Sequence, residues 1–346
     1  MDITAARGKD AGFGEPGQPY VTQSGTSMAT PHVAGAAAVL KQRHPQWSPE
    51  QLKAALMGSA QPNPSLGVFA QGAGRLDLAH AITQPVFATP ADLSFGEQRW
   101  PHGDDQPITT ELTYTNTGPD DITLNLAVTA TGPAGRPAPA GMFTLSRNPL
   151  TVPSGGRATV TADTRVGTED DAFTGYLTAT GGGVQVRSPL AVAREVESYD
   201  LTLVHTGRDG TPSNVYSTAV IPADAELALW DIRQFWGGDS TVTLRLPKGR
   251  YIIDSMIVGA EDTTMLNQPK VDLNASQQVN LDARLGKPIR VGIPDRSAIS
   301  VWAEVTTISH QGSSGVKDSV VGASFAGMCT ARGSVRRSAS PSSPPS

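Results

Sequence analysis

The stretch that decides the fold runs from Tyr20 to Gly35 and reads Tyr-Val-Thr-Gln-Ser-Gly-Thr-Ser-Met-Ala-Thr-Pro-His-Val-Ala-Gly. Ser27 stands where a glycine-containing turn gives way to a helix, and Pro31 falls in the first helical turn, where its missing N–H costs nothing. Such a serine lies at the positive end of the helix dipole, beside unpaired backbone N–H groups. These are the properties of a nucleophile for acyl transfer, although a serine that only caps the helix has the same position.

The helical signal is confined to the first quarter of the chain. A first helix is predicted over residues 27–44, and its middle, residues 33–40, is apolar or small on all sides, so we expect it to be buried. A second helix is predicted from Ser48, which is a good N-cap. Pro49 follows at the first helical position, and Gln51 completes a capping box.

After residue 84 the pattern changes to short strands. Apolar residues alternate over 112–114 and 122–128, with a turn at 116–119 between them. Strands at this spacing predict a β-sandwich over residues 84–194 and a second β-sandwich-like domain over 195–327. Residues 328–346 are rich in Arg, Ser and Pro, and we expect this tail to be disordered.

Composition excludes several classes of protein. The formal net charge of −5 argues against a nucleic-acid partner, and a single cysteine, Cys329, excludes an intrachain disulfide and a multi-cysteine metal site. No apolar run is long enough for a membrane span, and the first residues do not form a secretory signal. We interpret the acidic pairs as solvated turn residues, because no loop has the spacing of calcium ligands found in an EF-hand. We therefore expect the chain to bind no metal ion, and we expect no cofactor.

The Tyr20–Gly35 stretch closely resembles the serine segment of subtilisin-like serine peptidases. Residues 72–77, Gly-Ala-Gly-Arg-Leu-Asp, are similar to a segment near the end of that family's catalytic domain, and a short helix is expected after them. The resemblance covers residues 1–83, roughly the last quarter of such a domain. It implies a truncated α/β subtilisin-like remnant, mainly helical, in which Ser27 is the nucleophile and Gly25, Thr26 and Ser27 form the substrate and oxyanion region.

The two β regions resemble known modules more weakly. Residues 84–194 are similar to the fibronectin-III-like modules that follow many bacterial subtilases. Residues 246–251, Leu-Pro-Lys-Gly-Arg-Tyr, resemble turns in prealbumin-like or carboxypeptidase-regulatory-like sandwiches. The expected architecture is therefore multidomain, with the peptidase remnant followed by two all-β sandwich modules.

The triad partners that the family requires are missing from the expected positions. In this family the order along the chain is Asp, His, Ser, and the 26 residues before Ser27 contain no histidine. His32 belongs to the serine helix and is interpreted as a packing residue. We therefore expect an isolated chain to be inactive and to expose Val33, Val39 and Leu40, which the absent part of the domain would cover.

The sequence supports two functional readings. The first is the C-terminal part of an extracellular serine endopeptidase that acts on protein or peptide substrates, with an upstream segment as a possible complementing partner. The second is a non-catalytic β-sandwich protein that binds cell-surface polysaccharide or protein. The missing His and Asp keep the second reading open.

Overall fold

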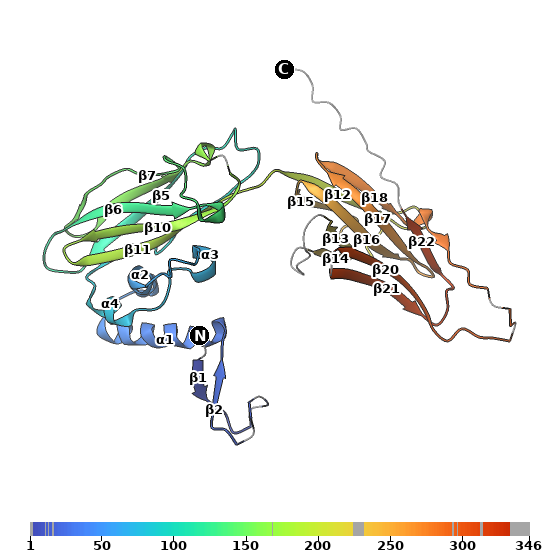
Figure 1. Cartoon of the computed structure of the whole chain (residues 1–346), viewed down its shortest axis with the longest axis horizontal. Coiled ribbons are helices and arrows are strands. Elements are labelled where there is room, and N and C mark those ends of the chain that lie inside the picture. The colour runs from blue at the N-terminus through green and yellow to red at the C-terminus, as the bar shows by residue number, and fades with distance from the viewer. Residues whose placement is uncertain are drawn as a thin grey trace, which may run out of the picture. The chain divides into compact units, whose positions relative to one another are not determined.

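A computed structural model of the chain describes residues 3–10, 12, 14–15, 17–167, 169–223, 232–292, 294–295, 297–311 and 314–332 (Figure 1). The chain divides into two compact units, Met1–Glu195 and Val196–Ser346. Most of the regular structure is β-strand, and all the α-helices of the described residues lie before residue 84.

The first unit begins with a two-stranded antiparallel sheet and four helices. These elements are β1 (Ile3–Ala6), β2 (Tyr20–Gln23), α1 (Thr26–Arg43), α2 (Pro49–Ser59), α3 (Val68–Gln71) and α4 (Leu78–Thr83). The predicted capping box at the start of α2 is confirmed, because Ser48 accepts from the backbone N–H of Gln51 and the Gln51 side chain accepts from that of Ser48. The helix expected after residue 77 is α4, with Asp77 as its N-cap, whereas α3 was not predicted.

Two sheets form the rest of the first unit. Strands β4, β11, β10, β6 and β8 make one sheet in that order, and β3, β5, β9 and β7 make the other. All neighbours are antiparallel except β4 and β11. The strands are β3 (Val86–Thr89), β4 (Leu93–Gln98), β5 (Ile108–Asn116), β6 (Ile122–Thr131), β7 (Phe143–Leu145), β8 (Leu150–Val152), β9 (Gly156–Ala162), β10 (Asp171–Gly181) and β11 (Val184–Arg194). Their core contains the fully buried Tyr114, Leu124 and Leu177.

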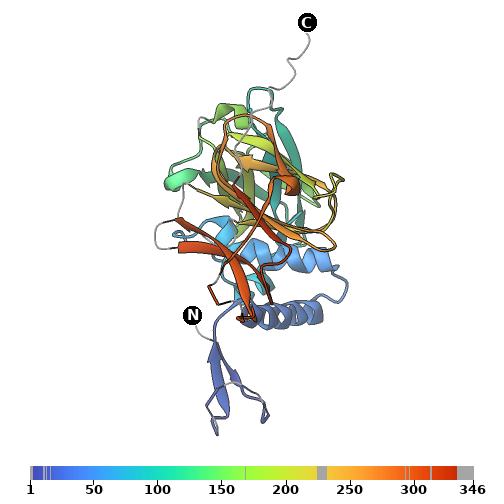
Figure 2. The same ribbon diagram turned by 90° about the vertical axis from the view of Figure 1, so that its right-hand side faces the viewer.

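The helices pack against this sandwich. α2 contacts β3 and β11, and α1 lies against α2 and α4 (Figures 1 and 2). A second core joins Leu40, Trp47 and Leu56 of the helical segment to Phe87 of β3. The expectation that Leu40 is exposed is wrong, because the sandwich and the following helices cover it. Val33 and Val39, by contrast, are 47% and 40% exposed.

The second unit is built from three sheets, ordered β15-β12-β18, β14-β13-β16-β17-β22-β19 and β20-β21. The first two share a core that includes Leu201, Ile253 and Leu281. The strands are β12 (Ser198–Thr206), β13 (Tyr216–Pro222), β14 (Arg233–Trp236), β15 (Thr241–Pro247), β16 (Gly249–Val258), β17 (Thr263–Leu273), β18 (Gln277–Asp282), β19 (Lys287–Pro288), β20 (Ala303–Gln311), β21 (Ser314–Gly322) and β22 (Met328–Arg332).

The end of the chain differs from the sequence-based prediction. We expected disorder from residue 328, but Met328–Arg332 form β22, which pairs in parallel with β17. Met328 and Cys329 are buried there. The expectation of disorder is therefore wrong for the first residues of the predicted tail. Residues 333–346 lie outside the described part of the chain.

Candidate active-site segment

Ser27 lies in the first turn of α1, at the end of a short loop that follows β2. Gly25 is the N-cap, with φ 145° and ψ 168°, a left-handed backbone conformation that favours glycine. The Gly25 carbonyl accepts from the N–H groups of Met28 and Ala29 at 3.1 and 3.3 Å. No side chain caps the helix, so the N–H groups of Thr26 and Ser27 have no partner among the described residues. They are open donors at the positive end of the helix.

The Ser27 side chain is exposed, and its hydroxyl makes no hydrogen bond with any described residue. The nearest histidine along the chain, His32, is held by its own helix, because its Nδ1 lies 2.9 Å from the carbonyl oxygen of Met28. A general base must be within hydrogen-bond reach of the proton that it removes. No hydrogen bond joins His32 to Ser27 among the described residues, so His32 does not meet this condition.

The other histidines whose side chains the structure describes also have partners other than Ser27. His44 is half-buried and stacks on Trp47, with ring centroids 3.8 Å apart. The remaining three are bonded through ring nitrogens: His80 to the Ser59 carbonyl, His102 to Asp105 and the Glu195 carbonyl, and His205 to the Ser240 carbonyl and Thr218. The described part of the chain therefore presents a serine with the right backbone setting and brings no imidazole to it.

An apolar pocket of about 690 Å³ lies beside the first turns of α1. Its walls come from β1, α1, α2 and the loop between α3 and α4. Its lining residues are Ile3, Gly25, Ala29, His32, Val33, Leu56, Met57, Ala60, Gly72, Ala73, Gly74, Arg75 and Leu76. A helix that is apolar on all sides is normally buried, so the exposed face of α1 and this pocket together form a surface suited to further packing.

Hydrogen bonds and a close backbone approach hold the Gly72–Arg75 wall of this pocket in place. Gln61 and Arg75 exchange two backbone hydrogen bonds of 2.8 Å. Gly74 has φ +114°, and a Cβ there would lie 2.5 Å from the Gln61 carbonyl oxygen. The Tyr176 hydroxyl, from β10 of the sandwich, donates to the Gly72 carbonyl at 3.0 Å, and burial raises the pKa of this hydroxyl, so it keeps its proton. The sandwich thus helps to position the segment that the sequence analysis singled out.

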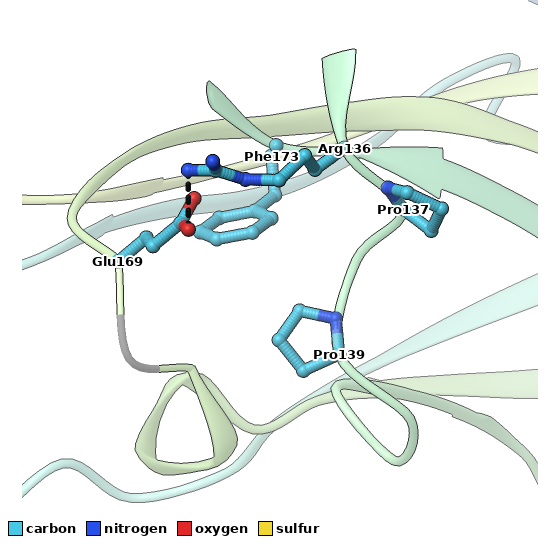
Figure 3. A pocket seen from close by; sticks show the side chains of 6 residues that line it. Arg136, Pro137, Pro139, Glu169 and Phe173 are labelled. Carbon is cyan, nitrogen blue, oxygen red and sulfur yellow. Dashed lines mark ion pairs between the residues drawn. The ribbon is translucent and has the colours of Figure 1, made fainter. Parts of the chain in front are cut away.

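A smaller pocket of about 110 Å³ lies at one end of the sandwich (Figure 3). The Arg136 side chain reaches past the Phe173 ring and forms an ion pair with Glu169, and Pro137 and Pro139 face them. Gly132 also lines the pocket, and a Cβ there would lie 2.3 Å from the Phe173 ring. Sequence patterns gave no sign of this arrangement, because Arg136 lies more than thirty residues from Glu169 and from Phe173 of β10.

Comparison with known proteins identifies the N-terminal segment. Residues 6–75 match the model of the subtilase family. This segment belongs to the subtilase family. The subtilase segment contains Ser27, the whole of α1 and the Gly72–Arg75 wall, so the resemblance seen in the sequence is confirmed.

The curated relatives are subtilisin-like proteases. The minor extracellular protease Vpr of Bacillus subtilis is 27% identical over 248 residues, which are 68% of this chain and 30% of the relative. Subtilisin-like protease SBT2.5 of Arabidopsis thaliana is 45% identical over 80 residues, 23% of this chain and 10% of the relative. SBT3 of Solanum lycopersicum is 36% identical over 103 residues, 23% of this chain and 14% of the relative. The chain thus spans between a tenth and a third of the length of these relatives.

Solved structures resemble the chain only remotely. A family 123 glycoside hydrolase from Clostridium perfringens has a TM-score of 0.25 at 6% identity, over 32% of this chain and 25% of that chain. The VesB protease of Vibrio cholerae has a TM-score of 0.21 at 14% identity, over 33% of this chain and 32% of that chain. Within the described residues, no helix has the length and apolar character needed to cross a membrane.

Proposed function

We propose that this chain carries the serine-containing C-terminal part of an extracellular subtilisin-like endopeptidase, with Ser27 as the nucleophile. One observation carries the proposal: within a segment that matches the subtilase family, Ser27 stands exposed in the first turn of α1 beside open backbone N–H groups. The Ser27 oxygen would attack a peptide carbonyl. The N–H of Ser27 would then donate to the oxygen of the tetrahedral intermediate.

The proton acceptor for this reaction would come from residues outside the chain described here. A serine hydroxyl is a weak nucleophile unless a base removes its proton, and no histidine of the described residues is bonded to Ser27. We therefore infer that this chain alone does not hydrolyse peptide bonds at an enzyme's rate, and that it acts with the His- and Asp-bearing part of a subtilase domain.

The surface for that part is the exposed face of α1 together with the apolar pocket. Val33 lines the pocket, Val39 is exposed on the same helix, and no other strand of the described residues pairs with the β1–β2 sheet. We propose that an upstream subtilase segment covers these groups. In this division residues 1–83 are the peptidase part, 84–194 a fibronectin-III-like sandwich, and 195–327 a prealbumin-like or carboxypeptidase-regulatory-like module.

Complementation tests this function. The purified chain is mixed with a polypeptide that comprises the upstream catalytic part of the Bacillus subtilis relative, and casein cleavage is measured. We expect cleavage from the mixture and none from either component alone, and we expect Ser27→Ala to abolish it. Complex formation without cleavage would contradict the role of Ser27, whereas the absence of a complex would contradict the proposed docking surface.

A second function, binding of cell-surface polysaccharide, is favoured by exposed aromatic side chains in the second unit. Trp236 on β14 is 72% exposed and Trp302, next to β20, is 67% exposed. Exposed tryptophan rings provide flat apolar surfaces of the kind that interaction sites use. Retention of the chain on insoluble glycans, lost in a Trp236→Ala/Trp302→Ala variant, would support this function. Equal recovery of the two proteins in the unbound fraction would exclude it.

A further inference from the structure

A cluster of polar side chains lies in the first unit near the end of β11. It takes no part in the reaction proposed for Ser27. Its members come from four separate stretches of chain: the loop before β5, the 3₁₀-helix Thr164–Val166, the loop before β10, and β11 itself. We refer to this group as the His102 cluster; it consists of His102, Asp105, Thr164, Asp170 and Arg194. His102, Asp105 and Thr164 are only 6%, 8% and 2% exposed.

Both ring nitrogens of His102 face oxygen atoms that can only accept hydrogen bonds. Nδ1 lies 2.9 Å from Asp105 Oδ2, and Nε2 lies 2.8 Å from the carbonyl oxygen of Glu195. The same Asp105 oxygen accepts from the hydroxyl of Thr164, as an ionised carboxylate does. A neutral imidazole has one donor and one acceptor nitrogen, so either tautomer would set two lone pairs against each other. Only an imidazolium satisfies both contacts.

The charges around His102 balance when it is cationic. Asp105 faces it from the loop before β5, and Asp170 Oδ1 lies 3.5 Å from its Nε2. From β11, Arg194 pairs with the same Asp170 oxygen at 2.7 Å. Two cations thus face two carboxylates, which is the condition under which buried charges are tolerated.

Two further charged groups border the cluster. The Glu195 carboxylate accepts from the backbone N–H of Trp100 at 2.9 Å. Arg165, on the same 3₁₀-helix as Thr164, interacts electrostatically with Asp105. Both lie at the edge of the cluster and leave the pairing of His102 unchanged.

The backbone is strained where the loop before β10 joins that strand, at Asp171, the first residue of β10. Asp171 has φ 124°, a conformation that non-glycine residues rarely adopt. Its neighbours are tied down on both sides: Asp170 by Arg194, and Glu169 by Arg136 across the small pocket (Figure 3). Loss of the His102 contacts would therefore weaken a loop that does not hold its shape unaided.

We propose that His102 carries a proton on each ring nitrogen and, in this charged form, clamps the end of β11 to the loop before β5. A neutral ring would lose one of the two hydrogen bonds that join these segments.

Nitrogen NMR of the full chain labelled with ¹⁵N-histidine tests the charge. At pH 7.5 we expect both His102 nitrogens to give protonated signals, while His205 gives one protonated and one unprotonated nitrogen. The His102 signals are assigned by their disappearance in His102→Gln. A neutral tautomer of His102 at pH 7.5 would overturn the proposal.

Two variants and hydrogen exchange test the clamp. Asp105→Asn removes the partner charge without changing the size of the side chain, and we expect one His102 nitrogen to give an unprotonated signal in this variant. Asp92→Asn, which breaks only an exposed ion pair with Lys53, should leave both His102 signals unchanged. In Asp105→Asn the amides of Trp100 and Glu195 should exchange at least about tenfold faster than in the unmodified chain, after correction for intrinsic rates. Unchanged exchange would refute the clamp even if the charge is confirmed.

Discussion

At the residue scale, Gly74 fixes the wall of the apolar pocket beside Ser27. Its φ of +114° and the 2.5 Å approach to the Gln61 carbonyl leave no room for a side chain. We predict that Gly74→Ala lowers the free energy of unfolding of the first unit by at least about 2 kcal/mol, from backbone strain and the clash. Urea denaturation measures this. Gly103→Ala is the matched control, because nothing lies within 4 Å of a Cβ there, and an equal loss in both variants would contradict the assignment.

His205 gives the second unit a pH-dependent stability. It is fully buried between β12 and β13, and burial lowers the pKa of its imidazole. Nδ1 donates to the Ser240 carbonyl and Nε2 accepts from the Thr218 hydroxyl, so the neutral form is satisfied. Because the unfolded chain binds the proton more readily, stability should fall as the pH drops below about 6.5.

Hydrogen exchange of β12 and β13 measures this effect. We expect less protection at pH 5.5 than at pH 7.5 after correction for intrinsic rates. His205→Phe keeps a ring against Tyr216 but cannot titrate, so the pH difference should disappear in this variant, whatever its overall stability. A difference that persists in His205→Phe would show that another group is responsible.

Single residues also mark the limit of prediction from sequence. Ser27 and Gly25 could be assigned because their roles depend on neighbours in the chain. His102 could not, because the oxygen atoms that decide its charge belong to Asp105 nearby and to Glu195, more than ninety residues away. Only the pairing of the strands brings these groups together.

At the element scale, α2 depends on its N-terminal cap. Ser48 and Gln51 each accept from the other's backbone N–H, at 3.3 and 2.9 Å. Replacing Ser48 by alanine should lower the free energy of unfolding by about 1 kcal/mol, because one amide at the helix start loses its partner. Ser65→Ala, in an exposed loop, is the control. Equal denaturation midpoints for Ser48→Ala and the unmodified chain would exclude a role for the cap.

The helices themselves were predictable, but their packing was not. Pro49 and the capping box locate α2 from local chemistry alone. The placement of Pro31 in the first turn of α1 is wrong, because the helix already begins at Thr26 and Pro31 lies in its interior. The same reasoning placed Leu40 at an uncovered surface, because it considered only the packing partners of a complete subtilase domain. In the structure α2 lies between α1 and the sandwich, and Leu40 is buried with Trp47. An apolar surface packs against whatever partner the chain provides.

At the scale of the whole molecule, the subtilase segment and the first sandwich share a core. Gly58 of α2 faces Val186 of β11, and a Cβ at Gly58 would lie 3.0 Å from that side chain. We predict that Gly58→Leu destabilises α2 and the sandwich together, by about 1–3 kcal/mol, because overpacking disrupts their joint interface. Hydrogen exchange should report coupled loss of protection in α2 and β11. Loss confined to α2 would contradict a common folding unit.

The central claim is that Ser27 is presented for acyl transfer while its proton acceptor lies outside the described chain. Reaction of the purified chain with a fluorophosphonate probe tests this most directly, because such probes label a serine that a neighbouring base has activated. We predict labelling of the unmodified chain no higher than that of Ser27→Ala, and labelling of Ser27 once the upstream subtilase part is added. Labelling of Ser27 in the chain alone would contradict the claim.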